Sequence, residues 1–343
     1  MRWSERVTLP AETRVVLAAL AAAALPAEPV ALVGGFVRDL LLGRETRDLD
    51  VVVVGGGAAL ARRLGERLAA EPRVHPSFDT AELRIGELRV DVASAREERY
   101  PAPAALPVVM PAALVTDLGR RDFTVNAMAL PLAAGSLAEI LDPHQGRTAL
   151  ATRRLTVLHD RSFRDDPTRI LRGLELAARL ELRFDPETEE LARAGAAHLD
   201  ELSSDRLEEA WDRLFPNARR LAEKLEALDR LGILRRLSPG LAQLPRSPAD
   251  RLAIALAAPG SGSVPVGKAV LAWLGRRGGS SVELDLARRF GSRELRGLGG
   301  RLARAETELS TGRPAHELEA AVAQLGAIEL AVLAATSPPA VAE

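Results

Sequence analysis

Residues Val33–Val54, which read VGGFVRDLLLGRETRDLDVVVV, decide how the N-terminal part of this 343-residue chain is predicted to fold. The segment opens with the glycine pair Gly34-Gly35, and Phe36–Leu42 then predicts a short helix. Glycine N–H groups and the positive end of that helix would face the same anion. The β-branched apolar run Leu49–Val54 predicts a buried strand.

Asp48 and Asp50 lie two residues apart at this strand, so both side chains are expected on one face of the sheet. Two carboxylates on one face are costly unless a cation neutralises them. Mg²⁺ bound jointly by Asp48, Asp50 and nucleotide phosphates meets that requirement, and Arg38 adds a positive group for the same anion. A glycine pair alone usually marks a turn, and an Asp-x-Asp alone usually marks a strand end. Their order and spacing together favour nucleotidyl transfer.

Composition narrows the class of protein. The net charge is −1, so a nucleic-acid ligand would need a local arginine groove instead of a global basic field. The absence of cysteine excludes disulfides and thiolate metal sites, and the five scattered histidines argue against zinc. Carboxylate-bound hard cations remain. The length predicts two or three domains.

The N-terminal run imitates a secretory signal, because arginines precede the apolar sequence VVLAALAAAALPA. Glu5 and Glu12 interrupt the basic region, however, and Pro26 follows the run as it would follow a packed helix over residues 11–25. No other stretch is long and apolar enough to span a membrane. We therefore expect a cytoplasmic protein with no membrane contact.

Downstream, two strands are predicted over Ala81–Ile85 and Leu88–Ala93. Asp91 lies between two valines of the second strand, so it is either a third catalytic carboxylate or an ordinary residue of the polar face. The proline-rich segment Pro101–Pro111 predicts a loop. Arg120-Arg121-Asp122 suits contacts with a triphosphate and a ribose, although a charged turn before a helix is the alternative.

From Arg153 onward helical spacing replaces strand-like alternation. Asp166, Arg169 and Arg172 fall at i, i+3 and i+6, so a helix would place them along one face. A carboxylate beside a guanidinium can read the hydrogen-bonding edge of a base. The alternative is structural, since Asp166 before Pro167 is also a good helix N-cap. Arginine-rich faces further along suit either an RNA backbone or solvent.

Taken in order, these motifs resemble the bacterial class II tRNA nucleotidyltransferase (CCA-adding enzyme)/poly(A) polymerase family. The resemblance runs from about residue 30 to about residue 235. It is carried by GGFVRD (34–39), DLD (48–50), RRDFTVNA (120–127), DP and the following Gly146, and DDPTRILR (165–172).

The resemblance implies an α+β fold, with a polymerase-β-like nucleotidyltransferase head built on a mixed sheet and an all-α neck, body and tail. We place the head at residues 1–150, the neck and body, which select the nucleobase, at 151–240, and the RNA-binding tail at 241–343. The tRNA 3′ end, CTP and ATP are the implied partners, and no protein partner is inferred. The implied chemistry is two-metal transfer of C and/or A nucleotides to the tRNA 3′ end, in which no nucleic-acid template is needed.

The resemblance also assigns the site residues. The implied metal ligands are Asp48 and Asp50, and Asp91 is the third candidate catalytic residue. The residues implied to bind the nucleotide are Gly34, Gly35, Arg38, Arg120, Arg121, Asp122, Asn126, Asp166, Arg169 and Arg172. Within this set Asp166 and Arg169 would act as a protein template that selects CTP or ATP, and Arg172 would support them.

The chain departs from the family pattern at two neck positions. Asp165 stands where glutamate is usual, and Glu175 stands where a further arginine is usual. The sequence therefore leaves open whether the chain adds CCA, CC only, A only or poly(A). From other classes, a non-catalytic RNA-binding module and a small-molecule nucleotidyltransferase remain alternatives.

Overall fold

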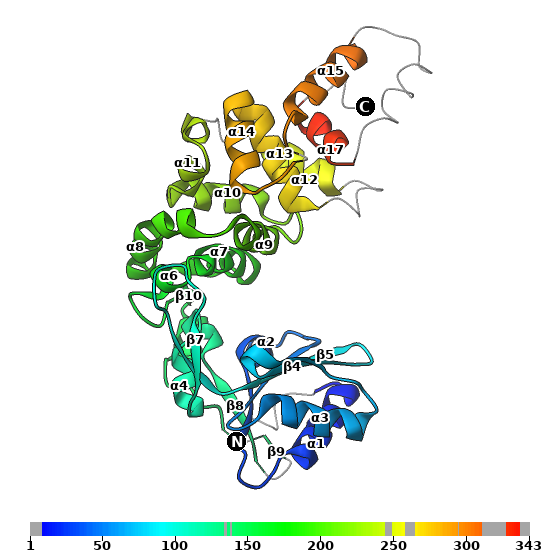
Figure 1. Cartoon of the computed structure of the whole chain (residues 1–343), viewed down its shortest axis with the longest axis vertical. Helices are drawn as coiled ribbons and strands as arrows, with labels where there is room; N and C mark the ends of the chain where they lie inside the picture. The colour runs from blue at the N-terminus through cyan, green and yellow to red at the C-terminus, as the bar shows by residue number, and fades with distance from the viewer. Residues whose placement is uncertain are drawn as a thin grey trace. The chain divides into compact units, whose positions relative to one another are not determined.

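The computed structural model describes residues 9–133, 136–137, 139–243, 249–257, 265–293, 295–310 and 327–336. By its internal contacts the chain divides into two units. Unit 1 comprises residues 1–162 and 183–188, and unit 2 comprises residues 163–182 and 189–343. Figure 1 shows the ribbon of both units. This division does not test the predicted boundary between the neck and body (151–240) and the tail (241–343), which stays a prediction.

Unit 1 is built on a mixed seven-stranded sheet in the order β3-β4-β5-β2-β1-β8-β9. Its strands are β1 (Val30–Val33), β2 (Asp48–Val53), β3 (Arg73–His75), β4 (Thr80–Ile85), β5 (Leu88–Ser94), β8 (Ala129–Ala133) and β9 (Ser136–Leu137). The central pair β2 and β5 is parallel, whereas the other neighbours are antiparallel. The predicted α+β fold with a mixed sheet is confirmed.

Unit 1 also contains α-helices. They are α1 (Ala11–Ala23), α2 (Gly34–Leu41), α3 (Gly57–Leu68), α4 (Leu114–Gly119) and α5 (Gly146–Ala151), with short 3₁₀ turns at Pro76–Phe78 and Thr124–Asn126. Helix α3 packs on β4 and β5, and α1 packs on α3 (Figure 1). The run that imitates a secretory signal is therefore a packed helix, with Val16 and Leu20 fully buried. Within the described residues, no helix combines the length and the apolar character needed to cross a bilayer.

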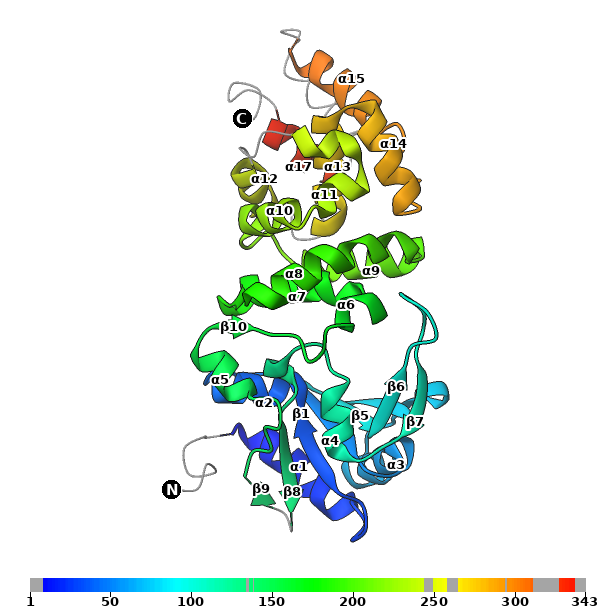
Figure 2. The ribbon, with the colours of Figure 1, turned by 90° about the vertical axis from the view of Figure 1, so that its left-hand side faces the viewer.

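One element differs from the sequence prediction. Residues Val108–Pro111 form strand β7, which pairs antiparallel with β6 (Arg96–Arg99), so the prediction of a loop over the whole of Pro101–Pro111 is wrong for its last four residues. Pro111 sits at the end of the strand, where a missing N–H interrupts no further pairing. Figure 2 shows this two-stranded ribbon beside the main sheet.

The second unit is helical in its described part. Its elements are α6 (Ser162–Asp165), α7 (Thr168–Leu180), α8 (Pro186–Gly195), α9 (Ser204–Leu214), α10 (Leu221–Arg230), α11 (Ile233–Leu237), α12 (Ala249–Ala257), α13 (Val266–Gly278), α14 (Ser280–Arg289), α15 (Leu298–Ser310) and α17 (Ala327–Thr336), with 3₁₀ turns at Ala196–Glu201 and Pro239–Gln243. The first residue of α6 and the start of α8 belong to unit 1, where β10 (Arg154–Leu155) pairs with β11 (Arg183–Phe184).

Aromatic side chains join the helices of unit 2. Trp211 on α9 is buried against Phe215 and Phe290, with ring centroids 4.9 and 5.4 Å away. Its indole N–H donates to the carbonyl of Gly267 over 3.0 Å. Because a buried indole needs such an acceptor, this contact fixes α13 against α9.

Candidate active site

The turn from β1 into α2 brings two glycines against a carboxylate. Gly34 has φ +65°, and a Cβ at this position would lie 2.9 Å from Oδ2 of Asp50. The N–H of Gly35 donates to the same oxygen over 3.2 Å. Only glycine combines this backbone conformation with so close an approach. The predicted glycine pair and the Asp-x-Asp strand therefore meet in space.

The acidic residues predicted from the sequence share one face of the sheet. Asp50 and Asp91 are directly opposite each other on the parallel strands β2 and β5, and Asp48 is opposite Arg89. Arg89 in turn forms ion pairs with Asp91 at 3.0 Å and with Glu82 at 3.2 Å. Asp91 thus points away from its buried valine neighbours, as predicted.

The electrostatics of this face leave it short of positive charge. Burial raises the pKa of Asp50, and the nearby Asp91 and Asp48 raise it further, although Arg121 and the Gly35 N–H oppose the shift. Burial likewise raises the pKa of Asp91 in spite of Arg89. Ionised carboxylates therefore cost free energy here until a cation joins them.

The donor atoms of this site fit a divalent metal ion for which the protein supplies only some of the ligands. Within the described residues, no group of three or more His, Cys, Asp or Glu side chains is arranged to hold a metal. Mg²⁺ is typically held by one or two carboxylates, and the substrate's phosphates and water complete its coordination. Asp48 and Asp50 on one face match that pattern, because a bound cation would offset the burial and the repulsion from Asp91 and Asp48 that raise the pKa of Asp50.

Arg38 is more enclosed than its predicted role suggests. Its guanidinium is buried and donates to both carboxylate oxygens of Asp39, at 2.9 and 2.8 Å, and to Oδ1 of Asn126 at 2.5 Å. Asn126 in turn donates to Asp122 over 2.9 Å. Three residues predicted to bind the nucleotide therefore form one hydrogen-bonded chain between α2 and the segment that follows α4. Their contact with a nucleotide stays a prediction.

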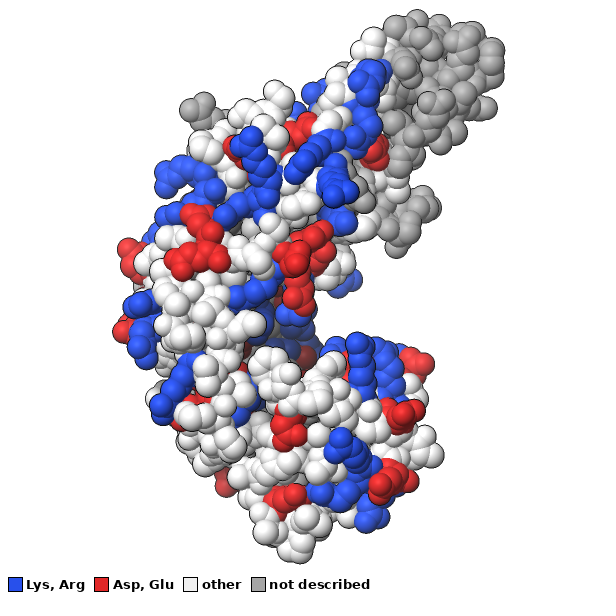
Figure 3. Space-filling view, viewed as in Figure 1, with Lys and Arg blue, Asp and Glu red and all other residues white. Residues whose placement is uncertain are grey.

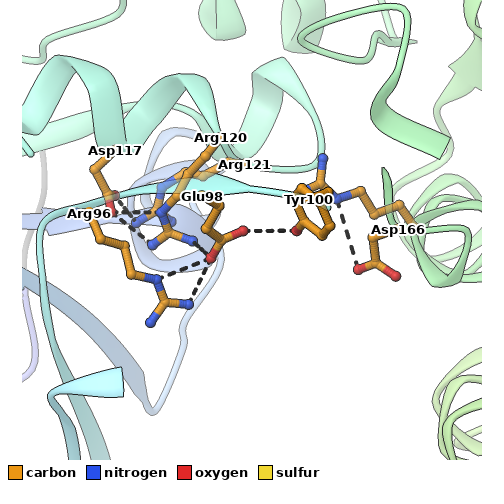
Figure 4. A network of polar contacts seen from close by, with 8 residues as sticks. Arg96, Glu98, Tyr100, Asp117, Arg120, Arg121 and Asp166 are labelled. Carbon is orange, nitrogen blue, oxygen red and sulfur yellow. Dashed lines mark hydrogen bonds and ion pairs between the residues drawn. The ribbon is translucent and has the colours of Figure 1, made fainter. Parts of the chain in front are cut away.

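The two neighbouring arginines after α4 have different surroundings (Figure 4). Arg120 forms ion pairs with Glu98 at 2.8 Å and with Asp117 at 2.7 Å. Arg121 donates to the other oxygen of Asp117 over 3.1 Å, and its Nη1 lies 3.0 Å from where a Cβ on Gly34 would be. Arg121 thus reaches the glycine turn and Asp50, whereas the ion pairs of Arg120 are with the network around Glu98.

Sequence reasoning missed the two carboxylates of this network. Glu98 accepts from Arg96, Arg120 and the Tyr100 hydroxyl, and burial is outweighed by these partners, so its pKa is lowered. Nothing in the sequence around Glu98 distinguishes it from Glu97. For Asp117 a signal existed, because Arg120 and Arg121 follow it at i+3 and i+4 on a helical turn.

In unit 2, Asp166 serves as a cap. It lies between α6 and α7, outside the helix, and its Oδ1 accepts from the N–H and the hydroxyl of Thr168 at 3.2 and 2.6 Å. The expectation of one continuous helical face for Asp166, Arg169 and Arg172 is therefore wrong for Asp166. Arg169 is buried with its Nε 4.0 Å from Asp166, and Arg172 is exposed.

A further residue near Asp166 could not be found from local spacing. Arg206 on α9 donates to Asp166 over 3.3 Å across a separation of 40 residues. Glu175, which stands where the family resemblance predicts an arginine, forms an i,i+4 ion pair with Arg179 at 3.1 Å. The described part of unit 2 also carries many arginines, and Figure 3 shows Lys and Arg side chains gathered over α11, α14 and α15.

Comparisons with known proteins agree with this geometry. Residues 30–156 match the family model described as the poly A polymerase head domain. The chain is 44% identical to the A-adding tRNA nucleotidyltransferase of Aquifex aeolicus over 47% of this chain and 20% of that protein. It is also 44% identical to the CC-adding tRNA nucleotidyltransferase of Deinococcus radiodurans, over 47% of this chain and 44% of that protein.

Among solved structures, a CCA-adding enzyme in its apo form II superimposes with a TM-score of 0.83 and 26% identity, over 99% of this chain and 82% of that one. The chain spans between 20% and 38% of the length of the first three curated relatives that it matches. Residues 30–156 are therefore similar to the head domain of poly A polymerases, and the chain shares its fold with a CCA-adding enzyme.

Proposed function

We propose that the chain transfers nucleotides from CTP and/or ATP to the 3′ end of tRNA without a nucleic-acid template. The observation that carries this proposal is the meeting of Asp50 with the Gly34-Gly35 turn and Arg121. Such a site offers carboxylates for a metal ion, N–H groups and a helix N-terminus for phosphates, and a guanidinium beside both. The choice of tRNA as the acceptor is supported by the relatives, which are named for adding A or CC to tRNA.

In the proposed reaction the 3′-terminal hydroxyl of the RNA attacks the α-phosphate of the nucleotide, and pyrophosphate leaves. Asp48 and Asp50 would hold Mg²⁺, which would supply Lewis-acid stabilisation of the charge on the phosphates. The Gly34-Gly35 turn leaves room for the triphosphate because neither residue has a Cβ. Arg121 holds the triphosphate and ribose, and the hydrogen-bonded chain of Arg38, Asn126 and Asp122 keeps α2 in place.

Nucleobase selection is assigned to unit 2. Asp166 presents its carboxylate from a capped turn, where Thr168 and Arg206 limit its rotation. Arg169, which is buried next to it, cannot easily change its position. A carboxylate acceptor and a guanidinium donor held in this way distinguish bases by their hydrogen-bonding edges.

The direct test uses purified protein, Mg²⁺ and three tRNAs that end before CCA, after C and after CC. Each receives CTP, ATP or both, and the product length is read at single-nucleotide resolution. Addition that stops after CCA on all three tRNAs identifies a complete CCA enzyme. ATP use only on the CC end identifies an A-adding enzyme, and two C residues without A identify a CC-adding one.

Two other results would replace this proposal. Long A tails on unrelated RNA would identify a poly(A) polymerase. No incorporation on any RNA would overturn nucleotidyl transfer to RNA, and it would favour a non-catalytic RNA-binding module or a small-molecule acceptor. The choice of Mg²⁺ is tested in parallel by replacing it with Ca²⁺ or Zn²⁺ after treatment with EDTA.

A cytoplasmic location stays a prediction, and cell fractionation would test it.

A further inference from the structure

Asp117 on α4 is a completely buried carboxylate at which three segments meet. Its exposed fraction is 0%, and its Oδ1 accepts from the N–H of Arg96 at 3.2 Å and from Nε of Arg120 at 2.9 Å. Its Oδ2 accepts from Nη2 of Arg121 at 3.1 Å. Each oxygen therefore has its own arginine, so the carboxylate holds the two guanidinium groups in different places (Figure 4).

The two arginines do not depend on Asp117 equally. Arg120 has a second carboxylate partner, because Glu98 accepts from it over 2.8 Å. The other end of Arg121 faces the glycine turn. A Cβ on Gly34 would lie 3.0 Å from Nη1 of Arg121 and 2.9 Å from Oδ2 of Asp50. Arg121 therefore lies between a buried carboxylate of α4 and the carboxylate that is proposed to bind the metal.

This arrangement addresses a physical difficulty. An arginine side chain has many rotamers, and it loses conformational entropy when one orientation is required. The Nη1 end of Arg121 lies beside the Gly34 turn and Asp50, and the hydrogen bond from Nη2 to Asp117 restricts the orientation of the group. Asp117 accepts a hydrogen bond from Nη2, so the guanidinium plane is oriented before a nucleotide binds.

We propose that Asp117 is a positioning residue, which anchors Arg121 so that its Nη1 end is presented to the phosphates of the bound nucleotide. The inference rests on the proposed function, and it adds a role for a residue that makes no contact with the reacting atoms. Because Arg120 keeps Glu98 as a partner, the proposal predicts that Asp117 acts on nucleotide binding mainly through Arg121.

A double-mutant cycle in the full chain tests this dependence. The variants are Asp117→Asn, Arg121→Ala and the double variant, assayed for kcat and KM with CTP and ATP on tRNA and for nucleotide Kd by calorimetry. We expect Asp117→Asn alone to lower kcat/KM roughly 10- to 100-fold, mainly by raising KM, because a displaced binding group loses its geometry. In the Arg121→Ala background the same change is expected to alter kcat/KM by less than about twofold. If Asp117 acts through Arg121, removing Arg121 already removes the effect of Asp117, so the two losses do not add.

Asp79→Asn is the matched control for a general loss of stability. Asp79 also has a lowered pKa and accepts from the N–H groups of Gly57 and Ala58, but it lies at the opposite end of β2 and contacts none of the site residues. Its kcat/KM per folded protein is expected to match the wild type even where its melting temperature falls as far as that of Asp117→Asn. A loss of kcat/KM in Asp79→Asn equal to that in Asp117→Asn would reduce Asp117 to a structural role and overturn the proposal.

The remaining outcomes separate this inference from the proposed function. An equal fold-loss from Asp117→Asn in both backgrounds overturns the positioning role, whatever the acceptor is. A wild-type protein that binds CTP or ATP without extending RNA overturns the proposed function alone. The positioning role is then tested by nucleotide Kd, which Asp117→Asn should raise in the wild-type background and leave nearly unchanged in the Arg121→Ala background. A wild-type protein that binds neither nucleotide overturns both.

Discussion

The N–H of Gly35 donates to Oδ2 of Asp50 over 3.2 Å, across 15 residues of sequence. This hydrogen bond joins the first turn of α2 to the strand that carries the acidic pair. It also sets the distance between the N–H groups that would face phosphate and the carboxylate that would hold the metal. Changes at either partner are therefore expected to affect chemistry before they affect folding.

Gly34→Ala is expected to impair nucleotide transfer more than stability. The new Cβ would meet Asp50 and Arg121 at 2.9 and 3.0 Å, in addition to the left-handed backbone cost of about 1–2 kcal/mol. Gly43→Ala is the control, since Gly43 has φ +64° with nothing within 4 Å of its added Cβ. Thermal unfolding should show a stability loss in both variants, larger in Gly34→Ala because of the added contacts, whereas kcat/KM should fall strongly only in Gly34→Ala. Equal activities would contradict the close packing at the site.

Asp50→Asn should leave the protein folded and strongly lower the rate of transfer. The amide keeps an acceptor for the Gly35 N–H and removes the charge of a partly buried carboxyl group whose pKa is raised, so the melting temperature is expected to stay level or rise. Loss of a metal ligand should lower kcat roughly a thousandfold, the equivalent of about 4 kcal/mol. Primer-extension gels and circular dichroism measure the two effects. Normal turnover in this variant would remove the metal assignment.

Arg169→Ala is expected to relax the choice between CTP and ATP more than it weakens tRNA binding. The buried guanidinium beside Asp166 is lost, and a charged hydrogen bond of about 1.4 kcal/mol corresponds to roughly a tenfold change in the CTP/ATP ratio of kcat/KM. Arg179→Ala on the same helix removes an arginine that pairs with Glu175, away from Asp166, and serves as the control. An unchanged ratio in Arg169→Ala would rule out the template role.

Asp117 should make the free energy of unfolding depend on pH. Burial alone would raise its pKa, but Arg121 and then Arg120 outweigh burial and hold the pKa below its ordinary value. The folded state therefore takes up this proton at lower pH than the unfolded chain does, and the stabilisation is complete above the ordinary pKa of about 3.9. It is lost as the pH falls from there through the lower folded value.

The measurement is chemical denaturation of the wild type and Asp117→Asn between pH 7 and pH 2. Breaking this buried pair is expected to cost about 3 kcal/mol at pH 7. The difference between the two proteins should then shrink as the pH falls below about 4, because the wild-type carboxyl also becomes neutral. A difference that stays constant over this range would show that the ionised carboxylate of Asp117 contributes no pH-dependent stability.

Short-range patterns in the sequence determined much of this protein. The period of two placed Asp48 and Asp50 on one face, the β-branched run after them predicted β2, and helical spacing predicted the helices that follow Arg153. These features depend on the backbone geometry of one segment, so the residues within that segment contain the information. The family resemblance then assigned roles that spacing alone left open.

Tertiary structure decided the contacts between segments. It made Val108–Pro111 a strand by pairing it with β6, enclosed Arg38 through Asn126 at a separation of 88 residues, and made Asp166 a cap that also meets Arg206. It also buried Asp117 and Glu98 as anchors for the arginine pair. Such contacts arise when packing removes water from distant side chains together and each buried charge must find a partner. No local period encodes that choice.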